Sequence, residues 1–570
     1  MAGRTDALVV DGSKVTESNR NAAIFYAQDG YDPKTKGLNG RRVAGDSFLR
    51  GFLRHADIDE AVFMSRELGE LDPVKSLIDA LRPGLVMRHV PVRVPGTMAP
   101  VATYFYPSPN YSTDAWRRAP YGTGAWSICG ITHTTSTLAV MRGFFDTRFA
   151  PVMDWDAVIC TSKAVKASVE VQFDLTDHHM RVHFGANPPP RPMLPVIPLG
   201  VHCEEFNSVV DAGLSLRERL GAKGSDVVFT TIARLTPHEK FDPLPVYTAL
   251  QRVQQTLPRG QKLHLVLCGV FSDPYGRKVF ESGAVALMPD VNFLILDGAE
   301  GENRTAALSG ADVFLFLIDN IQETFGLAPI EAMAAGLPLL VSDWDGMKDT
   351  VSSDVGLRVT TRTLPPRHTA EEALRHLGGV DSYTQYCASV SAVTEIDMAE
   401  LESKIRILVE NPDLRKSMGE AGKRRAKALY DWSKVIPQMQ DLWAEQDHIR
   451  RANSPRHRRY AAENLPVAPA PTKLFAAYPT EQTAHDGTTF IIAARDGLPN
   501  ILDTLRARDY LGIKRIFAAP KDIEAVYHTV LVLGEFGADL PAIVGATGLN
   551  RNTADRVVMW LLKYDFIRRL

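Results

Sequence analysis

Cysteines are few and long apolar runs are missing from this sequence of 570 residues. The five cysteines are scattered and no two stand in a C-x-x-C pair, which argues against a disulfide framework and against a thiolate metal site. The longest apolar run, residues 313–318, falls far short of the roughly 20 residues that a membrane helix needs. Acidic and basic side chains interrupt residues 1–20, so a secretory signal is not expected. A reducing, cytoplasmic location fits these absences.

An excess of charge of one sign is missing as well. Lysine and arginine number 64 against 67 aspartates and glutamates, a net charge of −3, so no overall field draws the chain to nucleic acid or anionic lipid. The content of 45% hydrophobic and 23% charged residues is that of a folded globular protein. At roughly 150 residues per domain, the length corresponds to three or four domains and excludes a single core.

Short β-rich runs alternate with helical stretches through residue 360, which is typical of parallel sheets covered by crossover helices. The predicted fold class is therefore α/β. One sheet is expected to contain strands at residues 22–26, 60–64, 102–106, 126–131, 157–161 and 194–198. A second sheet is expected to contain strands at residues 227–233, 263–268, 293–296, 312–318 and 337–342.

The composition changes twice in the second half of the chain. Residues 360–397 carry Pro-Pro and Gly-Gly pairs and are expected to form an inserted loop or small lid. Residues 447–472 combine an arginine run with alternating prolines, which is typical of an extended linker. The predicted parts are two sheet domains, the linker and an accessory domain, at residues 1–205, 206–446, 447–472 and 473–570.

Residues 311–343 predict a strand, a loop, a helix and a second strand. Pro329 suits the first helical turn and Gly336 ends the helix. The free N–H groups and positive dipole end at such a helix start can bind a phosphate. Glu323 and Glu331, on either side of the helix start, are suited to accept hydrogen bonds from sugar or ribose hydroxyls. The alternative is that Glu323 caps the helix and Glu331 complements its dipole, and spacing alone does not decide.

The residues from Glu323 to Pro338, ETFGLAPIEAMAAGLP, closely resemble the E-x7-E segment of family 4 glycosyltransferases, which are retaining enzymes of the GT-B fold. The resemblance implies two Rossmann-like domains that face each other across a cleft and a nucleotide-diphosphate sugar as donor. It places Glu323 at the donor sugar and Glu331 at the ribose. The other substrate-binding residues that it implies in this loop are Thr324, Phe325, Gly326 and Leu327.

A second segment follows that family's order. Ala233-Arg234-Leu235, followed by Lys240, resembles its G-R-L…K motif, in which the arginine and lysine bind the donor diphosphate. Two cations there stabilise the negative charge that grows on the leaving diphosphate. Ala233 replaces the usual glycine, and the spacing from Arg234 to Lys240 is one residue longer than is common. The alternative is a surface arginine and lysine that follow a strand.

Two weaker segments lie nearer the N-terminus. His133 ends a predicted strand where the family often carries a histidine that contacts the donor sugar, and the alternative is a satisfied loop histidine. Residues 37–49 resemble the family's glycine-rich loop after the first strand, which places Gly40 and Arg41 at the donor phosphate or the acceptor, and the alternative for Arg41 is a solvated helix start. The resemblance implies no cofactor and no metal, so we interpret the D-x-D triplets at residues 154–156 and 343–345 as acidic loops.

The end of the chain predicts a separate small domain. Residues 540–547, a turn at 548–550 and residues 551–563 have the spacing of a helix-turn-helix, with 564–570 as a wing. The result is a winged-helix-like end to a small α/β domain. Its surface is only mildly basic, so DNA is disfavoured as its partner relative to another protein or a second copy of the chain.

The leading interpretation is a retaining glycosyltransferase, EC class 2.4, that moves a hexosyl or related group from a nucleotide-diphosphate sugar to a glycan, lipid-linked or protein acceptor. Its expected catalytic residues are Glu323, Arg234, Lys240 and His133. One alternative is a regulator or interaction protein that senses a nucleotide sugar and acts through the winged end. Another is a phosphorylase or epimerase that uses the same pocket. For the arginine run, the alternative to a solvated linker is peripheral contact with the inner membrane face.

Overall fold

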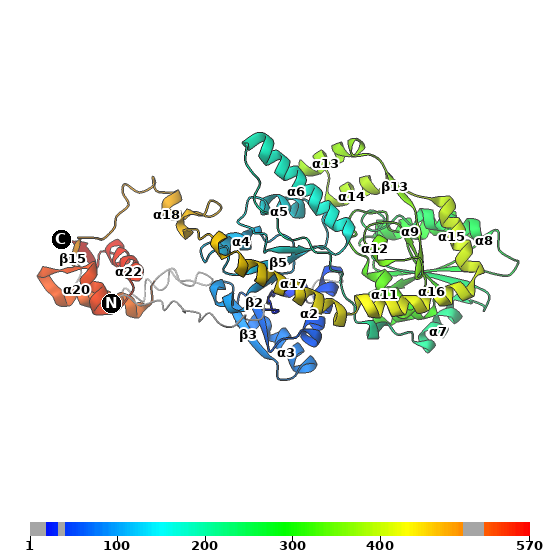
Figure 1. Cartoon of the computed structure of the whole chain (residues 1–570), viewed down its shortest axis with the longest axis horizontal. Coiled ribbons are helices and arrows are strands. Elements are labelled where there is room, and N and C mark those ends of the chain that lie inside the picture. Colours follow the sequence, from blue (N-terminus) through cyan, green and yellow to red (C-terminus); the bar gives the residue numbers. More distant parts are fainter. Residues whose placement is uncertain (1–18, 32–39, 494–517) are drawn as a thin grey trace. The chain divides into compact units, whose positions relative to one another are not determined.

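The computed structural model describes residues 19–31, 40–493 and 518–570, and for Gly40 and Arg41 it describes the backbone alone. The chain divides into two compact units, Met1–Val467 and Ala468–Leu570 (Figure 1). The first unit contains two six-stranded sheets, and the second contains a three-stranded sheet with its own apolar core.

The first sheet is parallel, with the strand order β3-β2-β1-β4-β5-β6 of a Rossmann fold. Its strands are β1 (Ala23–Phe25), β2 (Glu60–Ser65), β3 (Val86–Pro91), β4 (Thr103–Tyr106), β5 (Ser127–Ile131) and β6 (Ala157–Ile159). Its helices are α1 (Gln28–Tyr31), α2 (Gly40–His55), α3 (Asp72–Leu81), α4 (Ser112–Arg118), α5 (Leu138–Thr147) and α6 (Lys163–Phe184).

The second sheet is also parallel and has the equivalent order, β12-β11-β10-β7-β8-β9. Its strands are β7 (Val227–Ile232), β8 (Leu263–Gly269), β9 (Asn292–Asp297), β10 (Val313–Phe316), β11 (Leu339–Ser342) and β12 (Gly356–Val359). Its helices are α7 (Val210–Leu220), α8 (Leu244–Gln254), α9 (Pro274–Leu287), α10 (Gly301–Gly310), α11 (Leu327–Ala335), α12 (Met347–Thr350), α15 (Met398–Glu410) and α16 (Pro412–Arg425). The predicted α/β class with two Rossmann-like domains is therefore confirmed.

The strand predictions miss one of the two edge strands of each sheet. β3 carries Arg88 and His89 and ends at Pro91, and β12 contains a glycine and an arginine, so neither has the apolar run that betrays a central strand. Residues 194–198, predicted as a strand, instead make one isolated bridge, between Cys160 and Val196. The prolines in this segment remove backbone donors, so the ladder does not extend.

The inserted segment at residues 360–397 is folded, so its prediction as a loop is wrong. It consists of β13 (Thr361–Thr363), α13 (Ala370–Leu377), α14 (Tyr383–Ser391) and β14 (Thr394–Ile396). The two strands pair in antiparallel fashion and close the insertion at its base. The side chains of Ser382 and Gln385 form a capping box that starts α14, and the S-x-x-Q pattern in the sequence is the signal that was overlooked.

Helix α17 (Trp432–Ala452) returns from the second domain to the first. Trp432 and Trp443 are buried against aromatic rings of the first domain, among them Phe52 and Phe105. The helix ends beyond the predicted boundary at 446, and Asp447 is fully buried because it accepts hydrogen bonds from arginines of its own helix and from a backbone amide. The predicted boundary is therefore wrong, because these charges are paired within the domain rather than solvated.

The chain passes between the two domains at two places, around Val201 and around Trp432, and these two segments lie side by side. The Val201 amide donates to the Tyr430 carbonyl at 2.8 Å, and the Trp432 amide donates back to the Val201 carbonyl at 3.1 Å. Trp432 packs so closely that a Cβ placed on Gly200 would lie 2.4 Å from its ring, and one on Gly51 would lie 2.5 Å from it. Glycine is therefore required at both positions.

The arginine run also packs on the first domain instead of forming a free linker. Arg456 pairs with Asp154 at 2.7 Å, and the Tyr460 amide donates to the Ala119 carbonyl at 3.0 Å. Arg459 donates to the carbonyl of Pro120. The predicted start of the linker at residue 447 is therefore wrong, because the first compact unit extends to Val467 and the second begins at Ala468.

The second unit contains helices α18 (Pro471–Leu474), α20 (Pro520–Leu533), α21 (Leu540–Thr547) and α22 (Arg551–Lys563). Its antiparallel sheet has the order β16 (Ala538–Asp539), β15 (Thr489–Ile492), β17 (Ile567–Arg569). Asn550 caps α22 by accepting from the Thr553 amide at 2.9 Å. The short apolar run at residues 516–519 also predicts a strand, but residues 516 and 517 lie outside the described part. The winged-helix interpretation stays a prediction.

Within the described ranges, no helix is both long enough and apolar enough to cross a membrane.

A buried ion pair connects elements around β5 and β6 of the first sheet. The Arg118 guanidinium makes two bonds to the Asp156 carboxylate, at 2.6 and 2.7 Å, and both side chains are fully buried. Asp156 also accepts from the amides of Ile128 and Met153, both at 2.8 Å. One carboxylate therefore ties α4, β5 and the turn before β6 together, which is the physical role of this acid in its D-x-D triplet.

The two domains meet where α6 begins. The Ser162 hydroxyl donates to Asp345 Oδ1 at 3.0 Å, and the Lys163 amide donates to Asp349 at 2.7 Å. Asp345 lies just before α12 with a positive φ of 43°, and its second oxygen has no hydrogen-bond partner among the described residues. Burial raises the pKa of Asp345 to about 7, and the nearby Glu323 carboxylate adds to this rise against the opposing effect of the Gly346 amide.

We predict that Asp156→Asn lowers stability far more than Asp154→Asn. Removing one charge from a fully buried pair leaves Arg118 uncompensated and costs about 3–5 kcal/mol. Asp154 is a matched control in the same triplet, because its pair with Arg456 is about 40% exposed on both sides and contributes at most about 1 kcal/mol. Urea denaturation followed by tryptophan fluorescence measures both losses, and equal midpoints for the two variants would contradict the assigned role of Asp156.

We predict that Asp345→Asn changes how stability depends on pH. Folding raises the pKa of this carboxyl from 3.8 to about 7. The contribution of the protonated group to the free energy of unfolding is therefore complete below pH 4 and is lost as the pH rises through 7. The asparagine side chain cannot ionise. The free energy of unfolding of the variant, relative to that of the wild type, should therefore rise by up to roughly 3 kcal/mol between pH 5 and pH 8. Thermal melts across this range test it, with the exposed Asp146→Asn as control. A constant difference between variant and wild type would show that Asp345 does not titrate there.

Candidate functional site

The carboxyl ends of β7 and β10 bring two loops together. The strands are neighbours in the sheet and parallel, so the loops that follow them lie at the same edge, where open α/β sheets bind ligands. The first loop carries Arg234 and Lys240, and the second carries Glu323 and leads into α11. The structure therefore places three of the four predicted catalytic residues at one edge.

Lys240 and Glu323 form an ion pair across these loops. The Lys240 ammonium donates to Glu323 Oε2, and it lies 5.2 Å from the centre of the Phe316 ring. Glu323 Oε1 accepts from the amides of Thr324 and Gly326 at 3.3 and 3.1 Å. Burial opposes ionisation of Glu323, but Lys240 and these amides prevail and lower its pKa. The carboxylate is therefore ionised at neutral pH.

Arg234 is held beside this pair by two side chains. One guanidinium nitrogen lies 3.3 Å from Glu239 Oε2, and the other donates to the side chain of Gln322. The Arg234 side chain is 38% exposed, so its charge stays accessible to a ligand. The added residue in the Arg-to-Lys spacing does not keep the two cations apart, because both reach the loop that contains Glu323. Sequence reasoning missed Glu239 and Gln322, and no local pattern singles them out.

The start of α11 has no side-chain cap. Gly326 precedes the helix with a φ of +81°, its own amide donates to Glu323, and Pro329 in the first turn has no N–H to donate. The N–H groups of a first turn without a cap, together with the helix dipole, favour an anion at this position. The helix starts beside Lys240 and Arg234, so side chains and backbone present positive charge to the same place.

The other loop residues predicted to bind substrate lie in different surroundings. Phe325 is 2% exposed and packs edge-on against Tyr430, with 6.2 Å between ring centres, so its side chain belongs to the core and its contact with substrate stays a prediction. The Thr324 carbonyl accepts from the Thr161 hydroxyl of the first domain at 3.3 Å. Leu327 lines a pocket next to the loop.

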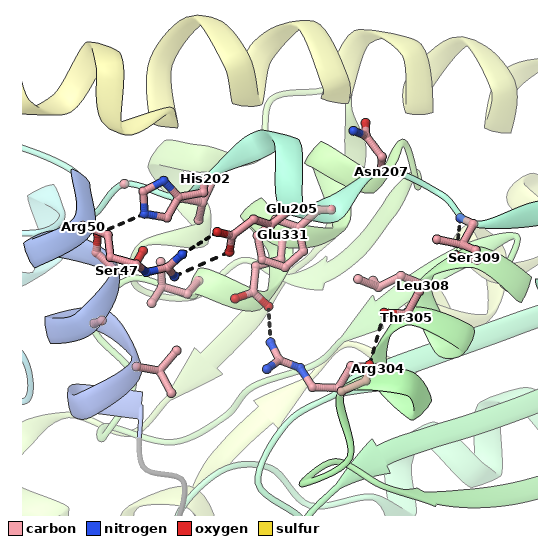
Figure 2. Close-up of a pocket in the computed structure, with 18 residues that line it drawn as sticks. Ser47, Arg50, His202, Glu205, Asn207, Arg304, Thr305, Leu308, Ser309 and Glu331 are labelled. Carbon is pink, nitrogen blue, oxygen red and sulfur yellow. Dashed lines mark hydrogen bonds and ion pairs between the residues drawn. The ribbon is translucent and has the colours of Figure 1, made fainter. Parts of the chain in front are cut away.

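This pocket has a volume of about 310 Å³ and lies between α2, the segment at residues 200–209, α10 and the start of α11. Glu331 faces it and pairs with Arg304 at 3.3 Å, while Arg50 of the first domain pairs with Glu205 (Figure 2). Burial raises the pKa of Glu331, Arg304 opposes the rise, and Glu205 adds to it. His202 also lines the pocket, and its pKa is lowered by burial and by Arg50. Sequence reasoning identified only Glu331 of these five.

His133 makes a hydrogen bond within the first domain. It follows β5, and its Nε2 donates to the Pro107 carbonyl at 2.8 Å. This is the contact expected of a hydrogen-bonded loop histidine, and its role at a donor sugar stays a prediction. Gly40 and Arg41 start α2, but their side chains and residues 37–39 lie outside the described part, so the predicted phosphate or acceptor contact is not described.

Both D-x-D triplets are engaged in ion pairs. Asp154 and Asp156 pair with arginines, and Asp343 pairs with Arg358 at 3.3 Å. Among the described residues, no group of three or more histidine, cysteine, aspartate or glutamate side chains is placed to hold a metal ion.

Comparisons with known proteins add to this geometry. Residues 215–377 match the sequence profile of the family described as Glycosyl transferases group 1. A sequence comparison with curated proteins gives no match.

Solved structures give several partial similarities. HepE from Anabaena in complex with UDP is 14% identical, with 74% of this chain and 100% of that chain covered and a TM-score of 0.49. Sucrose-phosphate synthase from Thermosynechococcus elongatus is 16% identical, with 75% and 99% covered and a TM-score of 0.45. A glycosyltransferase from Rickettsia africae ESF-5 is 12% identical, with 75% and 98% covered and a TM-score of 0.47.

The matched family profile includes the whole second sheet, and with it Arg234, Lys240, Glu323 and Glu331. The candidate site thus lies in the part of the chain that matches group 1 glycosyl transferases, and the two Rossmann-like domains form a GT-B fold.

Proposed function

We propose that the protein is a retaining glycosyltransferase that transfers a sugar from a nucleotide-diphosphate sugar to an acceptor. The observation that carries this proposal is the convergence of Arg234, Lys240 and Glu323 at the uncapped start of α11, next to the pocket that holds Glu331. The match of residues 215–377 to group 1 glycosyl transferases supports it.

The donor would bind along this edge of the second sheet. The diphosphate lies between the two cations and the first amides of α11, where its charge is balanced without a metal ion. The nucleoside extends into the pocket, where Glu331 accepts hydrogen bonds from the ribose hydroxyls. Arg304 holds the Glu331 carboxylate in one orientation, so the acceptor oxygens are placed before the ribose arrives.

Catalysis would rest on stabilising the leaving diphosphate. As the bond from the sugar to the diphosphate breaks, negative charge grows on the leaving oxygens beside Arg234 and Lys240. The sugar carbon gains positive charge at the same time. In the proposed binding mode, the ionised Glu323 carboxylate faces this carbon, while Lys240 faces the diphosphate. We propose that an acceptor hydroxyl attacks from the face that the diphosphate leaves, without a protein nucleophile. The new C–O bond forms as the bond to the diphosphate breaks, the hydroxyl proton passes to the leaving phosphate oxygen, and the configuration at the sugar carbon is retained.

We predict that Glu323→Gln lowers turnover by about 100-fold or more, because a neutral amide neither stabilises the developing positive charge nor pairs with Lys240. The measurement is release of nucleoside diphosphate from a panel of nucleotide sugars, with sugar products identified by NMR. Glu420→Gln, at an exposed position on α16, is the matched control and should turn over like the wild type.

The same assay separates the alternatives. Normal turnover by Glu323→Gln would overturn its assignment. A product of inverted configuration would overturn retention, and an epimerised nucleotide sugar would indicate an epimerase instead of a transferase.

We predict that Glu331→Gln weakens binding of a nucleoside diphosphate by roughly 10- to 100-fold and leaves binding of inorganic pyrophosphate unchanged. The reason is that Glu331 contacts the ribose, while the diphosphate depends on Arg234, Lys240 and α11. Isothermal titration calorimetry with UDP, GDP, ADP and pyrophosphate measures both. Equal losses for pyrophosphate and the nucleotides would mean that Glu331 supports the fold of the site rather than the ribose.

A further inference from the structure

The inserted segment brings one helix against the candidate site. The first turn of α14 carries Tyr383 and Thr384, and each side chain contacts a different domain. The Tyr383 hydroxyl lies 2.8 Å from the Ser136 hydroxyl in the loop after β5 of the first domain. The Thr384 hydroxyl donates to Glu239 Oε1 in the loop after β7 of the second domain. Two consecutive residues of the insertion therefore bridge the domains.

Thr384 acts on Arg234 through one carboxylate. Glu239 accepts from Thr384 with Oε1 and contacts Arg234 with Oε2, at 3.3 Å. A carboxylate engaged at both oxygens has a fixed plane, and it therefore fixes the guanidinium that it faces. Without that contact, Gln322 alone of these two side chains would hold Arg234, and a side chain this exposed would lose more rotamer freedom when its ligand binds.

Tyr383 extends the same chain of contacts to the first domain. Its partner Ser136 is itself 2.8 Å from the Thr134 hydroxyl, in the loop that contains His133. The capping box at Ser382 and Gln385 makes the first turn of α14 rigid, so a shift of Tyr383 moves Thr384 with it. The contact between domains and the hold on Arg234 thus share one turn of helix.

The remaining face of α14 confirms that this helix belongs to the site. Cys387, one turn further along, is fully buried, and burial together with the Glu239 charge raises its pKa to about 11 against opposing effects of Tyr383 and Arg234. Ser391 is also buried, and burial raises the pKa of Asp319, which precedes the loop of Glu323, to about 7 against the opposing effect of the nearby Ser391 side chain. One side of the helix therefore follows the edge of the second sheet from Arg234 to Asp319.

We propose that Thr384 and Glu239 are positioning residues for Arg234, and that Tyr383 makes this positioning depend on contact between the two domains. The inference rests on the proposed function only in taking Arg234 as a ligand of the donor diphosphate. It assigns the insertion a specific role: the diphosphate is held tightly when the domains are together and weakly when they are apart.

The first test is Thr384→Val in the full chain, with UDP, GDP, ADP and pyrophosphate as calorimetric probes. Loss of the hydroxyl frees Glu239, and the affinity for a diphosphate that the wild type binds should fall roughly 3- to 10-fold. Thr384→Ser keeps the hydroxyl and should restore the affinity to within about twofold of the wild type. Thr363→Val, exposed on β13 of the same insertion, is the matched control and should bind like the wild type.

The second test is Tyr383→Phe, which removes one hydroxyl that contacts no residue proposed to bind the donor. It should weaken diphosphate binding in the same direction as Thr384→Val. The double variant should lose less than the product of the two single effects, because both act through one turn. If the losses of affinity in the two single variants multiply in the double variant, the two contacts are independent. That result would overturn the proposal that the positioning of Arg234 depends on contact between the domains.

Kinetics distinguish positioning from general destabilisation. In Thr384→Val the KM for the donor should rise with the loss of diphosphate affinity while kcat changes less, because Thr384 touches no reacting atom. Thermal midpoints should match those of Thr363→Val. Should Thr384→Val fail to fold, Glu239→Gln gives the same test at the next link, since the amide no longer holds the guanidinium by charge.

The outcomes separate this inference from the proposed function. A wild-type protein that binds none of the four probes overturns both. A wild type that binds a diphosphate, with Thr384→Val and Glu239→Gln binding equally well, overturns the inference and leaves the proposed function standing.

Discussion

The adjacency of β7 and β10 is the constraint on which the candidate site depends. Their residues lie about 80 positions apart in sequence, yet the sheet order makes them neighbours whose loops end at one edge. The pair between Lys240 and Glu323 closes this edge, and Arg234, the start of α11 and the pocket of Glu331 are arranged around it. A parallel sheet thus assembles a charged site from residues that no short sequence window contains.

Charge is distributed over the site in a definite order. Two cations lie beside the uncapped start of α11, whereas two carboxylates, Glu205 and Glu331, face the neighbouring pocket with an arginine opposite each. A ligand that is anionic in its middle and rich in hydroxyls at one end matches this order. The same logic explains why Asp345 is costly to ionise, since it is buried close to Glu323 where positive charge is already engaged.

The sequence allowed the central strands and the core of the site to be predicted, because buried parallel strands are continuous apolar runs and the Glu323 segment is dense in specific residues. The edge strands β3 and β12 were missed because their faces are partly exposed and polar. The end of α17 was misjudged because Asp447 and its arginines satisfy one another inside the fold. The burial of the Phe325 side chain was not foreseen, since an aromatic residue in a binding loop is equally suited to the core.

Glu239 and Arg304 show a different limit. Each is one charged residue among many, and its importance comes from partners 5 to 145 positions away that only the fold brings near. No periodicity or spacing encodes such contacts.

The paired crossings between the domains have a mechanical consequence. Val201 and the residues around Asp431 are joined by backbone hydrogen bonds, and Trp432 fills the space beside Gly200. Two connecting segments joined in this way are expected to act as a hinge with a single rotation axis. They resist sliding and pulling apart, and they leave rotation about their common line as the soft degree of freedom. Any opening between the two domains is then expected to be greatest at the side far from Trp432.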